Sequence, residues 1–316
     1  MSNFEKALQT FSKHYSNRLG GIKASTPALG SVQQYHYLDN PDKLKPGNGP
    51  RILYHGKATD HVIVLTHGLS DSPYYLFAIA KRFYEVGCNV VMPLLPAHGL
   101  IDPDKAMEDK ALDSKWKACI DNGVNTAKLI GGKISVGGFS TGGALSLNKI
   151  LRHPDLIQGG LFLFSGALSV GGTAEKAGRL SFIQSITKLT DGKLPGIGQD
   201  PYKYPQLPNF AGLELTQIIN ENNRALNGLK INQPVMAVHS IHDETARPEG
   251  ITQFIEDHVK RGSAIFIAQN VAHSHLPLDK NVPLDLSQEL APKYPPIANP
   301  QFEWMMEGVI RFFRSI

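Results

Sequence analysis

The pattern of apolar positions divides the chain into a short N-terminal part and a longer part that alternates between two periodicities. Over residues 3–19 apolar side chains recur at helical spacing, which predicts an amphipathic helix. Its apolar face consists of Phe4, Ala7, Leu8 and Phe11. Two stretches of alternating polarity follow, Val32–Tyr37 and Arg51–His55, and the turn-rich sequence DNPDKLKPGNGP lies between them. We therefore predict a helix followed by an antiparallel β-hairpin.

After residue 60 the pattern changes to short apolar runs that alternate with segments of helical spacing. The predicted strands are Val62–His67, Asn89–Leu95, Ile134–Gly137, Gln158–Ser165, Pro234–Ser240 and Ala264–Ala268. The predicted helices cover residues 74–86, 114–130, 141–152, 249–260 and 301–314. Strands that are apolar throughout are typical of parallel sheets with both faces covered. The fold class is therefore α/β, with a doubly wound, mostly parallel sheet.

Residues 169–230 interrupt this alternation and carry no strong strand signal. Amphipathic spacing occurs near Phe182–Leu189 and Leu215–Leu226. We expect this segment to form a small, mainly helical cap inserted into the α/β core. The core then consists of residues 1–168, which include the N-terminal helix and hairpin, and residues 231–316.

Composition narrows the class of protein. Hydrophobic residues make up 41% and charged residues 19% of the 316 residues, which allows a sizeable core and argues against disorder. The formal net charge of +4 is small for this length, and no block of Lys or Arg indicates a nucleic-acid partner. No metal-binding HExxH motif occurs, and no G-x-G-x-x-G or P-loop sequence indicates a nucleotide cofactor. We expect neither cofactor nor metal.

The two cysteines, Cys88 and Cys119, belong to no CxxC motif, so we expect buried free thiols in a reducing compartment. The N-terminal sequence lacks the apolar core of a signal peptide. No apolar stretch reaches the roughly 18–20 residues that a membrane-spanning helix needs. These features predict a cytoplasmic location.

The sequence GFSTGG at residues 138–143 contains the pattern G-x-S-x-G between an apolar run and a predicted helix. A tight strand-to-helix turn places its central serine in strained backbone geometry, and flanking glycines avoid collisions with neighbouring backbone. The following helix N-terminus favours negative charge that develops beside the serine. We therefore interpret Ser140 as a nucleophile and Gly138 and Gly142 as the glycines that the turn requires. The alternative is that Ser140 only caps the helix.

The sequence THGLSDSP follows the first parallel strand, where a loop can supply part of an oxyanion hole. Such a hole needs two converging backbone N–H groups. The residue after the nucleophile, Thr141, supplies one, and Leu69 in this loop offers the other. His67 and Gly68 would then line the site, unless they form only a strand-terminating turn.

An acid and a base follow two later strands. The strand PVMAVHS is followed by His-Asp-Glu, and we choose Asp243 as the acid because Glu244 would face the opposite way. The strand AIFIA is followed by two candidate bases, His273 and His275. Histidine suits this role because its ordinary pKa of about 6.5 is close to working pH.

Three further residues have side chains that could take part in catalysis or substrate binding. We interpret His98 as a residue that fixes a loop near the site rather than one that reacts. Ser165 ends a strand but lacks the flanking glycine pattern, so we interpret it as structural. Trp116 is interpreted as a helix-packing residue.

The chain order serine, aspartate, histidine is that of the α/β-hydrolases. The sequence resembles the carboxylesterase and monoacylglycerol-lipase-like branch of that superfamily in four places. HGLSDSPY resembles the branch's HG-x-[ST]-x-[ST] oxyanion loop, and LLPAHG resembles its P-x-x-GHG turn, with Ala97 in place of the usual Gly. GFSTGG resembles its nucleophile elbow, the tight strand-to-helix turn that carries the catalytic serine. NVAH occupies the place of its N-S-G-H turn, with Ala272 in place of Gly.

The resemblance covers residues 60–316 and implies the α/β-hydrolase fold, with a cap after the sixth strand that fits residues 169–230. The interval of 30 positions from Asp243 to His273 resembles the acid–base spacing of small bacterial carboxylesterases, and this resemblance selects His273 over His275. The implied activity is hydrolysis of a small-molecule carboxylic ester through an acyl-enzyme on Ser140. Lysophospholipase, thioesterase or amidase activity of the same triad remains an alternative, as does a catalytically silent binding protein. The sequence gives no indication of the oligomeric state.

Overall fold

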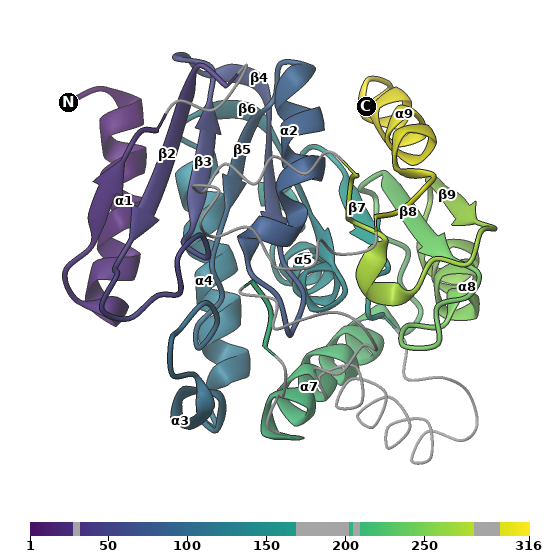
Figure 1. The fold of residues 1–316 in the computed structure, drawn as a ribbon. Coiled ribbons are helices and arrows are strands. Elements are labelled where there is room, and N and C mark those ends of the chain that lie inside the picture. Colours follow the sequence, from purple (N-terminus) through teal and green to yellow (C-terminus); the bar gives the residue numbers. More distant parts are fainter. Residues whose placement is uncertain (28–31, 169–201, 205–208, 281–297) are drawn as a thin grey trace.

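Nine strands of the computed structural model form one sheet, in the order β1-β2-β3-β5-β4-β6-β7-β8-β9 (Figure 1). The structure describes residues 1–27, 32–168, 202–204, 209–280 and 298–316. The strands are β1 (Lys23–Ser25), β2 (Gln34–Asp39), β3 (Arg51–Tyr54), β4 (Thr59–Thr66), β5 (Asn89–Met92), β6 (Gly131–Phe139), β7 (Leu161–Phe164), β8 (Val235–Ser240) and β9 (Gly262–Ile267). The α-helices are α1 (Asn3–Leu19), α2 (Phe77–Glu85), α3 (Asp104–Met107), α4 (Leu112–Ala127), α5 (Thr141–Arg152), α7 (Asn209–Leu226), α8 (Pro248–His258) and α9 (Phe302–Phe313). Short 3₁₀ helices are η1 (Pro73–Leu76), η2 (Pro154–Leu156) and η3 (His273–His275).

The sheet is mostly parallel, as the sequence predicts. From β5 through β4, β6, β7 and β8 to β9 every neighbouring pair is parallel. The strands β1, β2 and β3 are antiparallel additions at one edge, and β3 joins the parallel part by an antiparallel pairing with β5. The predicted hairpin is therefore β2 with β3. Because the carboxyl ends of the parallel strands lie at one edge, the loops that follow β4, β6, β8 and β9 can meet there.

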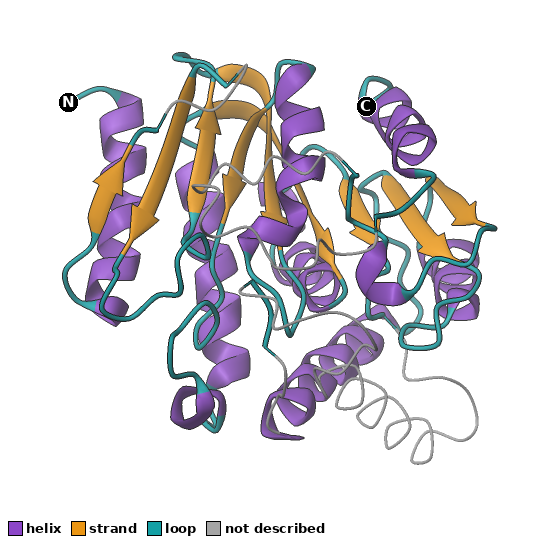
Figure 2. Ribbon diagram, in the orientation of Figure 1, coloured by secondary structure: helices purple, strands orange, loops and turns teal. Residues whose placement is uncertain are grey.

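Helices cover both faces of the sheet (Figure 2). Side chains of the central strands alternate between the two cores beneath these helices. In β4, Val62 and Val64 pack in the core that contains residues of α1, α4, α5, α7 and α8. Their neighbours Ile63 and Leu65 pack in the core that contains residues of α2 and α9. Successive residues of a strand point to opposite faces, so a strand buried on both faces must be apolar at every position. This requirement explains the uninterrupted apolar runs of the sequence.

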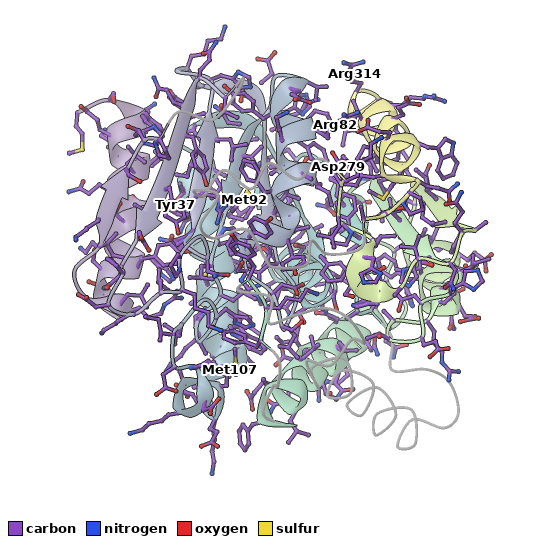
Figure 3. The ribbon with its side chains drawn as sticks, in the orientation of Figure 1. Tyr37, Arg82, Met92, Met107, Asp279 and Arg314 are labelled. Carbon is purple, nitrogen blue, oxygen red and sulfur yellow. The ribbon has the colours of Figure 1, made fainter. Side chains whose placement is uncertain are left out.

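Some elements differ from the sequence-based prediction. The strand β1 is short and exposed along its whole length, so it has no apolar pattern to detect. The short helix α3 contributes one buried side chain, Met107, and lies at the lower edge of the molecule in Figure 3. The helix predicted over residues 74–86 is divided, because η1 begins at Pro73 and α2 begins at Phe77. The amphipathic segment Phe182–Leu189 lies outside the described residues.

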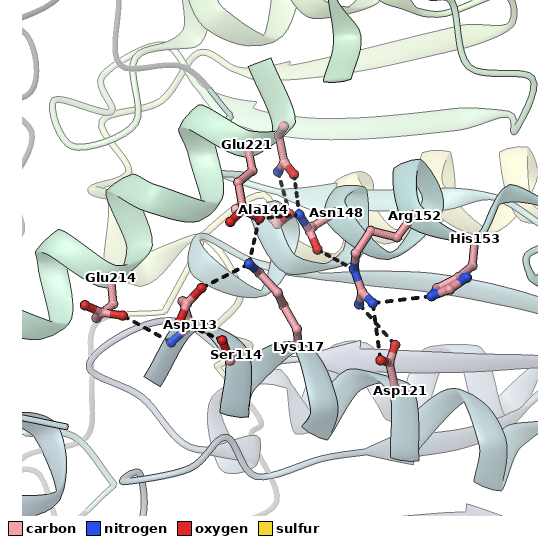
Figure 4. Close-up of polar contacts among 11 residues, drawn as sticks. Asp113, Ser114, Lys117, Asp121, Ala144, Asn148, Arg152, His153, Glu214 and Glu221 are labelled. Carbon is pink, nitrogen blue, oxygen red and sulfur yellow. Dashed lines mark hydrogen bonds and ion pairs between the residues drawn. The ribbon is translucent and has the colours of Figure 1, made fainter. Parts of the chain in front are cut away.

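The other amphipathic segment of the predicted cap lies within α7, which begins six residues earlier than the predicted start at Leu215. Polar side chains join α7 to the helices beneath it (Figure 4). Lys117 of α4 lies 2.6 Å from Glu221 of α7. Asn222 donates a hydrogen bond of 2.8 Å to Ala144 O of α5 and accepts one of 2.9 Å from Asn148. The helix that follows the predicted nucleophile is thus also in direct contact with α7.

Both cysteines are buried free thiols, as expected: Cys88 lies just before β5 and Cys119 lies on α4. Burial raises the pKa of each thiol, so neither side chain is an activated nucleophile.

Candidate active site

Ser140 lies at the sharp turn between β6 and α5, with φ 50° and ψ −110°. Left-handed backbone of this kind costs free energy for a residue with a side chain and is typical of functional sites. The turn is tight on both sides: a Cβ on Gly138 would lie 2.3 Å from Thr66 O, and a Cβ on Gly142 would lie 1.9 Å from the same atom. Any side chain at these positions would therefore collide with the backbone of β4. The two glycines that the sequence pattern singled out are required by this packing.

Backbone hydrogen bonds hold the turn in place. Ser140 N donates to Phe164 O of β7 at 3.1 Å, and Ser140 O accepts from Ala167 N at 3.1 Å. The Ser140 residue is 5% exposed, so its hydroxyl group has limited access to solvent. The strained serine is therefore anchored to the neighbouring strand rather than free to relax.

Asp243 and His273 form a buried pair. The Nδ1 atom of His273 lies 2.7 Å from Oδ2 of Asp243, although the residues come from loops after different strands. The other oxygen, Oδ1, accepts backbone hydrogen bonds from Thr245 N at 2.9 Å and Ala246 N at 2.8 Å. Glu244 is exposed. The carboxylate is thus fixed by the backbone on one side and faces the imidazole on the other.

A second histidine, His239 of β8, lies against the same carboxylate. Its Nε2 atom lies 3.3 Å from Asp243 Oδ2 and also contacts Ala246 O, so Nε2 faces two acceptors and carries the proton. Burial opposes ionisation of Asp243. The charge of His273 and the hydrogen bonds from His239 and His273 outweigh burial and hold the pKa of Asp243 well below its usual range. Asp243 is therefore ionised throughout the pH range in which the protein stays folded.

Sequence reasoning did not single out His239. The available signal was a histidine inside an otherwise apolar strand, four residues before the acid. A buried polar side chain at such a position needs a partner, and the nearest carboxylate supplies it.

The elements that carry the predicted nucleophile and base meet, since the ring of Phe139, the residue before Ser140, is 4.7 Å from the ring of His273. Within the described part of the chain no hydrogen bond joins the side chains of Ser140 and His273. Catalytic hydrogen bonds of this type are often long in unliganded enzymes and shorten when substrate binds.

The competing histidine, His275, has a different environment. Its Nε2 atom is buried and, among the described residues, has no hydrogen-bond partner. Burial, together with the charge of Lys203, lowers the pKa of His275 to about 4. Of the two candidate bases, His273 is the one that the structure joins to Asp243.

The two predicted oxyanion donors are both unpaired. Neither Leu69 N–H nor Thr141 N–H donates a hydrogen bond to any atom in the part of the chain that the structure describes. Thr141 is the first residue of α5, where an N–H group has no partner within the helix. Leu69 itself is buried, at 4% exposure, so its free N–H group is not explained by contact with bulk water.

Two buried histidines hold the loop that carries Leu69. His67 Nε2 accepts a hydrogen bond from Leu95 N at 3.1 Å, which requires its proton on Nδ1, and Nδ1 donates to Gly68 O at 2.8 Å. His98 lies with Nε2 2.6 Å from Leu69 O and Nδ1 3.0 Å from Pro96 O. His98 therefore fixes a loop, which is the role that the sequence predicts for it.

Ser165 and Trp116 have the structural surroundings expected for them. Ser165 follows β7 with φ 45°, is fully buried, and its N–H group donates to Val238 O at 2.8 Å. Trp116 is buried on α4 and donates from Nε1 to Pro96 O at 3.0 Å.

The described residues contain no group of three or more side chains arranged to hold a metal ion. Among the same residues, no helix combines the length and apolar character that crossing a bilayer requires.

The strand order, the strained serine after β6 and the buried Asp–His pair after β8 and β9 define the α/β-hydrolase fold. A curated relative supports this class. The thermostable monoacylglycerol lipase of Bacillus sp. (strain H-257) is 24% identical over 221 residues, which cover 68% of this chain and 80% of that protein. No family model matches the chain.

Solved structures agree on the fold. A structure from the work on LipS and LipT, two metagenome-derived lipolytic enzymes, has a TM-score of 0.61 at 20% identity and covers 84% of this chain and 97% of that one. The monoacylglycerol lipase of Paleococcus ferrophilus has a TM-score of 0.58 at 17% identity and covers 84% of this chain and 98% of that one. The chain has the α/β-hydrolase fold, and its sequence is similar to that of a curated monoacylglycerol lipase.

Proposed function

We propose that this protein is a serine hydrolase that cleaves carboxylic esters through an acyl-enzyme on Ser140. One observation carries the proposal: a strained serine follows Phe139, whose ring contacts the ring of a histidine that is hydrogen-bonded, at 2.7 Å, to a buried carboxylate. This arrangement raises the nucleophilicity of a serine hydroxyl at neutral pH. Carboxylic ester hydrolysis is also the activity that the comparisons support, because the similar proteins are esterases and lipases.

In the proposed reaction, Ser140 Oγ attacks the ester carbonyl carbon while Nε2 of His273 takes the hydroxyl proton. The N–H groups of Leu69 and Thr141 bind the oxyanion, and each such donor is typically worth about 2.7–4 kcal/mol in the transition state. The imidazolium of His273 then gives its proton to the departing alcohol. Asp243 keeps Nδ1 protonated and stabilises the imidazolium, because its own carboxyl group stays ionised.

Water then attacks the acyl carbon, and His273 takes a proton from this water. As the bond between the acyl carbon and Ser140 Oγ breaks, His273 returns the proton to Oγ and the carboxylic acid leaves. We further propose that the acyl chain binds beneath the predicted cap, residues 169–230. A thioester or an amide could follow the same steps, so substrate class must be measured.

The test is the variant Ser140→Ala, for which we expect loss of ester hydrolysis with the fold retained. The assay uses p-nitrophenyl esters of increasing acyl length, a monoacylglycerol, an acyl-CoA and an anilide. A fluorophosphonate probe should label Ser140 in the unmodified protein and leave the variant unlabelled. Turnover close to that of the unmodified protein in the Ser140→Ala variant would refute the proposal.

The matched control is Ser165→Ala. Ser165 is also a buried serine with positive φ at the end of a neighbouring strand, but no glycine precedes it, and among the described residues its hydroxyl has no hydrogen-bond partner. This variant should keep its ester hydrolysis and its labelling by the probe. If neither protein is labelled and no ester is cleaved, a binding protein with the α/β-hydrolase fold is the better interpretation.

A further inference from the structure

A short segment from the predicted cap, Tyr202–Tyr204, lies against the loop that carries the proposed oxyanion donor. We call residues His67–Tyr75 the oxyanion loop. Lys203 Nζ lies 3.1 Å from Oδ1 of Asp71 in this loop, and the side chains are 20% and 1% exposed. Lys203 Nζ also lies 4.4 Å above the ring of Tyr75. This largely buried ion pair joins the oxyanion loop to a segment that lies more than 100 residues later in the sequence.

The residues on either side of Lys203 contact the same loop. The ring of Tyr202 stacks on that of Tyr74, with centroids 3.6 Å apart and planes 11° apart. Tyr204 N donates a hydrogen bond of 2.9 Å to Ser70 O. Each residue of the segment thus has a partner in the oxyanion loop, which is more than one incidental contact.

These contacts complete a series of restraints on consecutive peptide groups. Gly68 O accepts from His67 Nδ1, Leu69 O lies 2.6 Å from His98 Nε2, and Ser70 O accepts from Tyr204 N. Gly68 O and Leu69 N belong to the same planar peptide group, so a restraint on Gly68 O sets the direction of the Leu69 N–H bond.

Asp71 acts on that same peptide group. Its N–H group donates to Gly68 O at 3.4 Å, and Oδ2 of its carboxylate lies where a Cβ on Gly68 would come within 2.5 Å. Oδ2 is buried and has no hydrogen-bond partner among the described residues. The position of the Asp71 carboxylate therefore depends on Lys203 and on Ser70, which also bonds to Oδ1, at 3.2 Å.

We propose that Lys203 is a positioning residue for ester hydrolysis: through Asp71 it sets the direction in which Leu69 N–H points at the reacting carbonyl oxygen. This inference rests on the proposed function and adds a residue that the sequence motifs do not contain. A donor of an oxyanion hole acts mainly in the transition state, so a change in its direction lowers kcat more than it changes KM.

The substitutions that test this proposal are Lys203→Met, Asp71→Asn, both together, and Lys203→Arg. Lys203→Met leaves a buried carboxylate without its cation. We expect kcat for a p-nitrophenyl ester to fall on the order of 10–100-fold, because small misplacements of catalytic groups cost up to about 100-fold. KM should change much less. Lys203→Arg keeps the charge and should recover most of the lost kcat.

The double variant measures the coupling between the two side chains. If Lys203 acts through Asp71, the loss in the double variant should be clearly smaller than the product of the two single losses. The control is Lys149→Met, because Lys149 is 4% exposed and lies 2.7 Å from Asp121, away from the oxyanion loop. This control should lose stability without the selective loss of kcat.

Thermal unfolding of every variant shows whether the assay temperature leaves it folded, and labelling of Ser140 by a fluorophosphonate shows that the nucleophile is present. A Lys203→Met protein that is folded and labelled but keeps kcat within about twofold of the unmodified protein would overturn the inference, as would multiplicative losses in the double variant. These outcomes leave ester hydrolysis itself intact. Absence of labelling and turnover in the unmodified protein would refute both proposals together.

Discussion

At the scale of single residues, the site depends on side chains that do not react themselves but orient the proposed catalytic groups. His239 illustrates this best, because it contacts the carboxylate of Asp243 from the side opposite the backbone donors Thr245 N and Ala246 N. Asp243 Oδ2 therefore faces two imidazoles, those of His239 and His273. A carboxylate held at both oxygens cannot rotate, and the orientation of His273 follows from it.

We predict that His239→Leu lowers kcat by on the order of tenfold, because Asp243 loses one of the groups that orient it. His239→Gln should retain most of kcat, since the amide nitrogen of glutamine can occupy the place of Nε2 and donate to the same oxygen. The measurement is a comparison of kcat for the two variants with one p-nitrophenyl ester. Equal kcat in the leucine and glutamine variants would show that the hydrogen bond has no positioning role.

The contrast between Ser140 and His239 shows what sequence alone can reveal. The elbow could be predicted because its constraint is local: two glycines, a strand and a helix stand in one short stretch. The contact of His239 with Asp243 depends on how the chain bends after β8, and that bend is stabilised by Thr245 and Ala246. No periodicity carries this information.

At the scale of elements, the apolar strands were the most predictable part of the chain. The part of β4 that is buried on both faces has an apolar residue at every position from Val62 to Leu65, and this run is visible in the sequence. The strand β1 is exposed throughout and has no apolar pattern. The helix α5 was predicted with its observed bounds because the elbow defines its start. The association of Lys203 with Asp71 could not be predicted, because the two residues lie far apart in the sequence and only the fold brings them together.

The contact between α7 and α5 leads to a prediction at this scale. Asn222 of α7 is buried, donates to Ala144 O of α5 and accepts from Asn148. The variant Asn222→Ala removes both bonds and leaves the buried Asn148 Nδ2 with only its 3.5 Å hydrogen bond to Glu221. We expect the free energy of unfolding to fall by about 1–3 kcal/mol. Urea unfolding of the variant and of the unmodified protein measures this change.

Catalysis should respond differently from stability in this variant. Ser140 is held by backbone bonds to Phe164 and Ala167, and neither bond involves α7. The kcat of Asn222→Ala should therefore stay within about threefold of the unmodified value under conditions where the variant is folded. A large loss of kcat without a loss of stability would mean that α7 acts on the site itself.

At the scale of the whole molecule, the fold buries two histidines of the oxyanion region, His67 and His98, in their neutral form. Burial lowers the pKa of His98 to about 4 and the pKa of His67 well below its ordinary value. Although Pro96 O and Leu69 O face both nitrogens of His98 and would accept from its imidazolium, the cost of burying the charge is larger. The same histidines support the oxyanion loop, so acid should act on stability and on the site together.

The sign of the pH effect follows from the lowered pKa. Above the unfolded pKa of about 6.5 both the folded and the unfolded chain hold His98 neutral, and the stabilisation is fully present. Between pH 6.5 and 4 the unfolded chain binds a proton that the folded chain does not, so stability falls as pH falls. Each fully buried histidine of this kind adds a slope of about 1.4 kcal/mol per pH unit within that window.

We therefore predict that the free energy of unfolding, measured in urea at several values between pH 7 and pH 5, declines steadily with acidification. The variant His98→Gln cannot take up this proton, but its amide can still donate to Leu69 O. Its free energy of unfolding should therefore fall less steeply with acidification, by about 1.4 kcal/mol per pH unit, which is the contribution of one histidine. His242→Gln is the control, because it replaces an exposed histidine with the same amide. Parallel declines in His98→Gln and the unmodified protein would mean that His98 takes up its proton equally in the folded and unfolded chain, and that burial at this position does not hold the imidazole neutral.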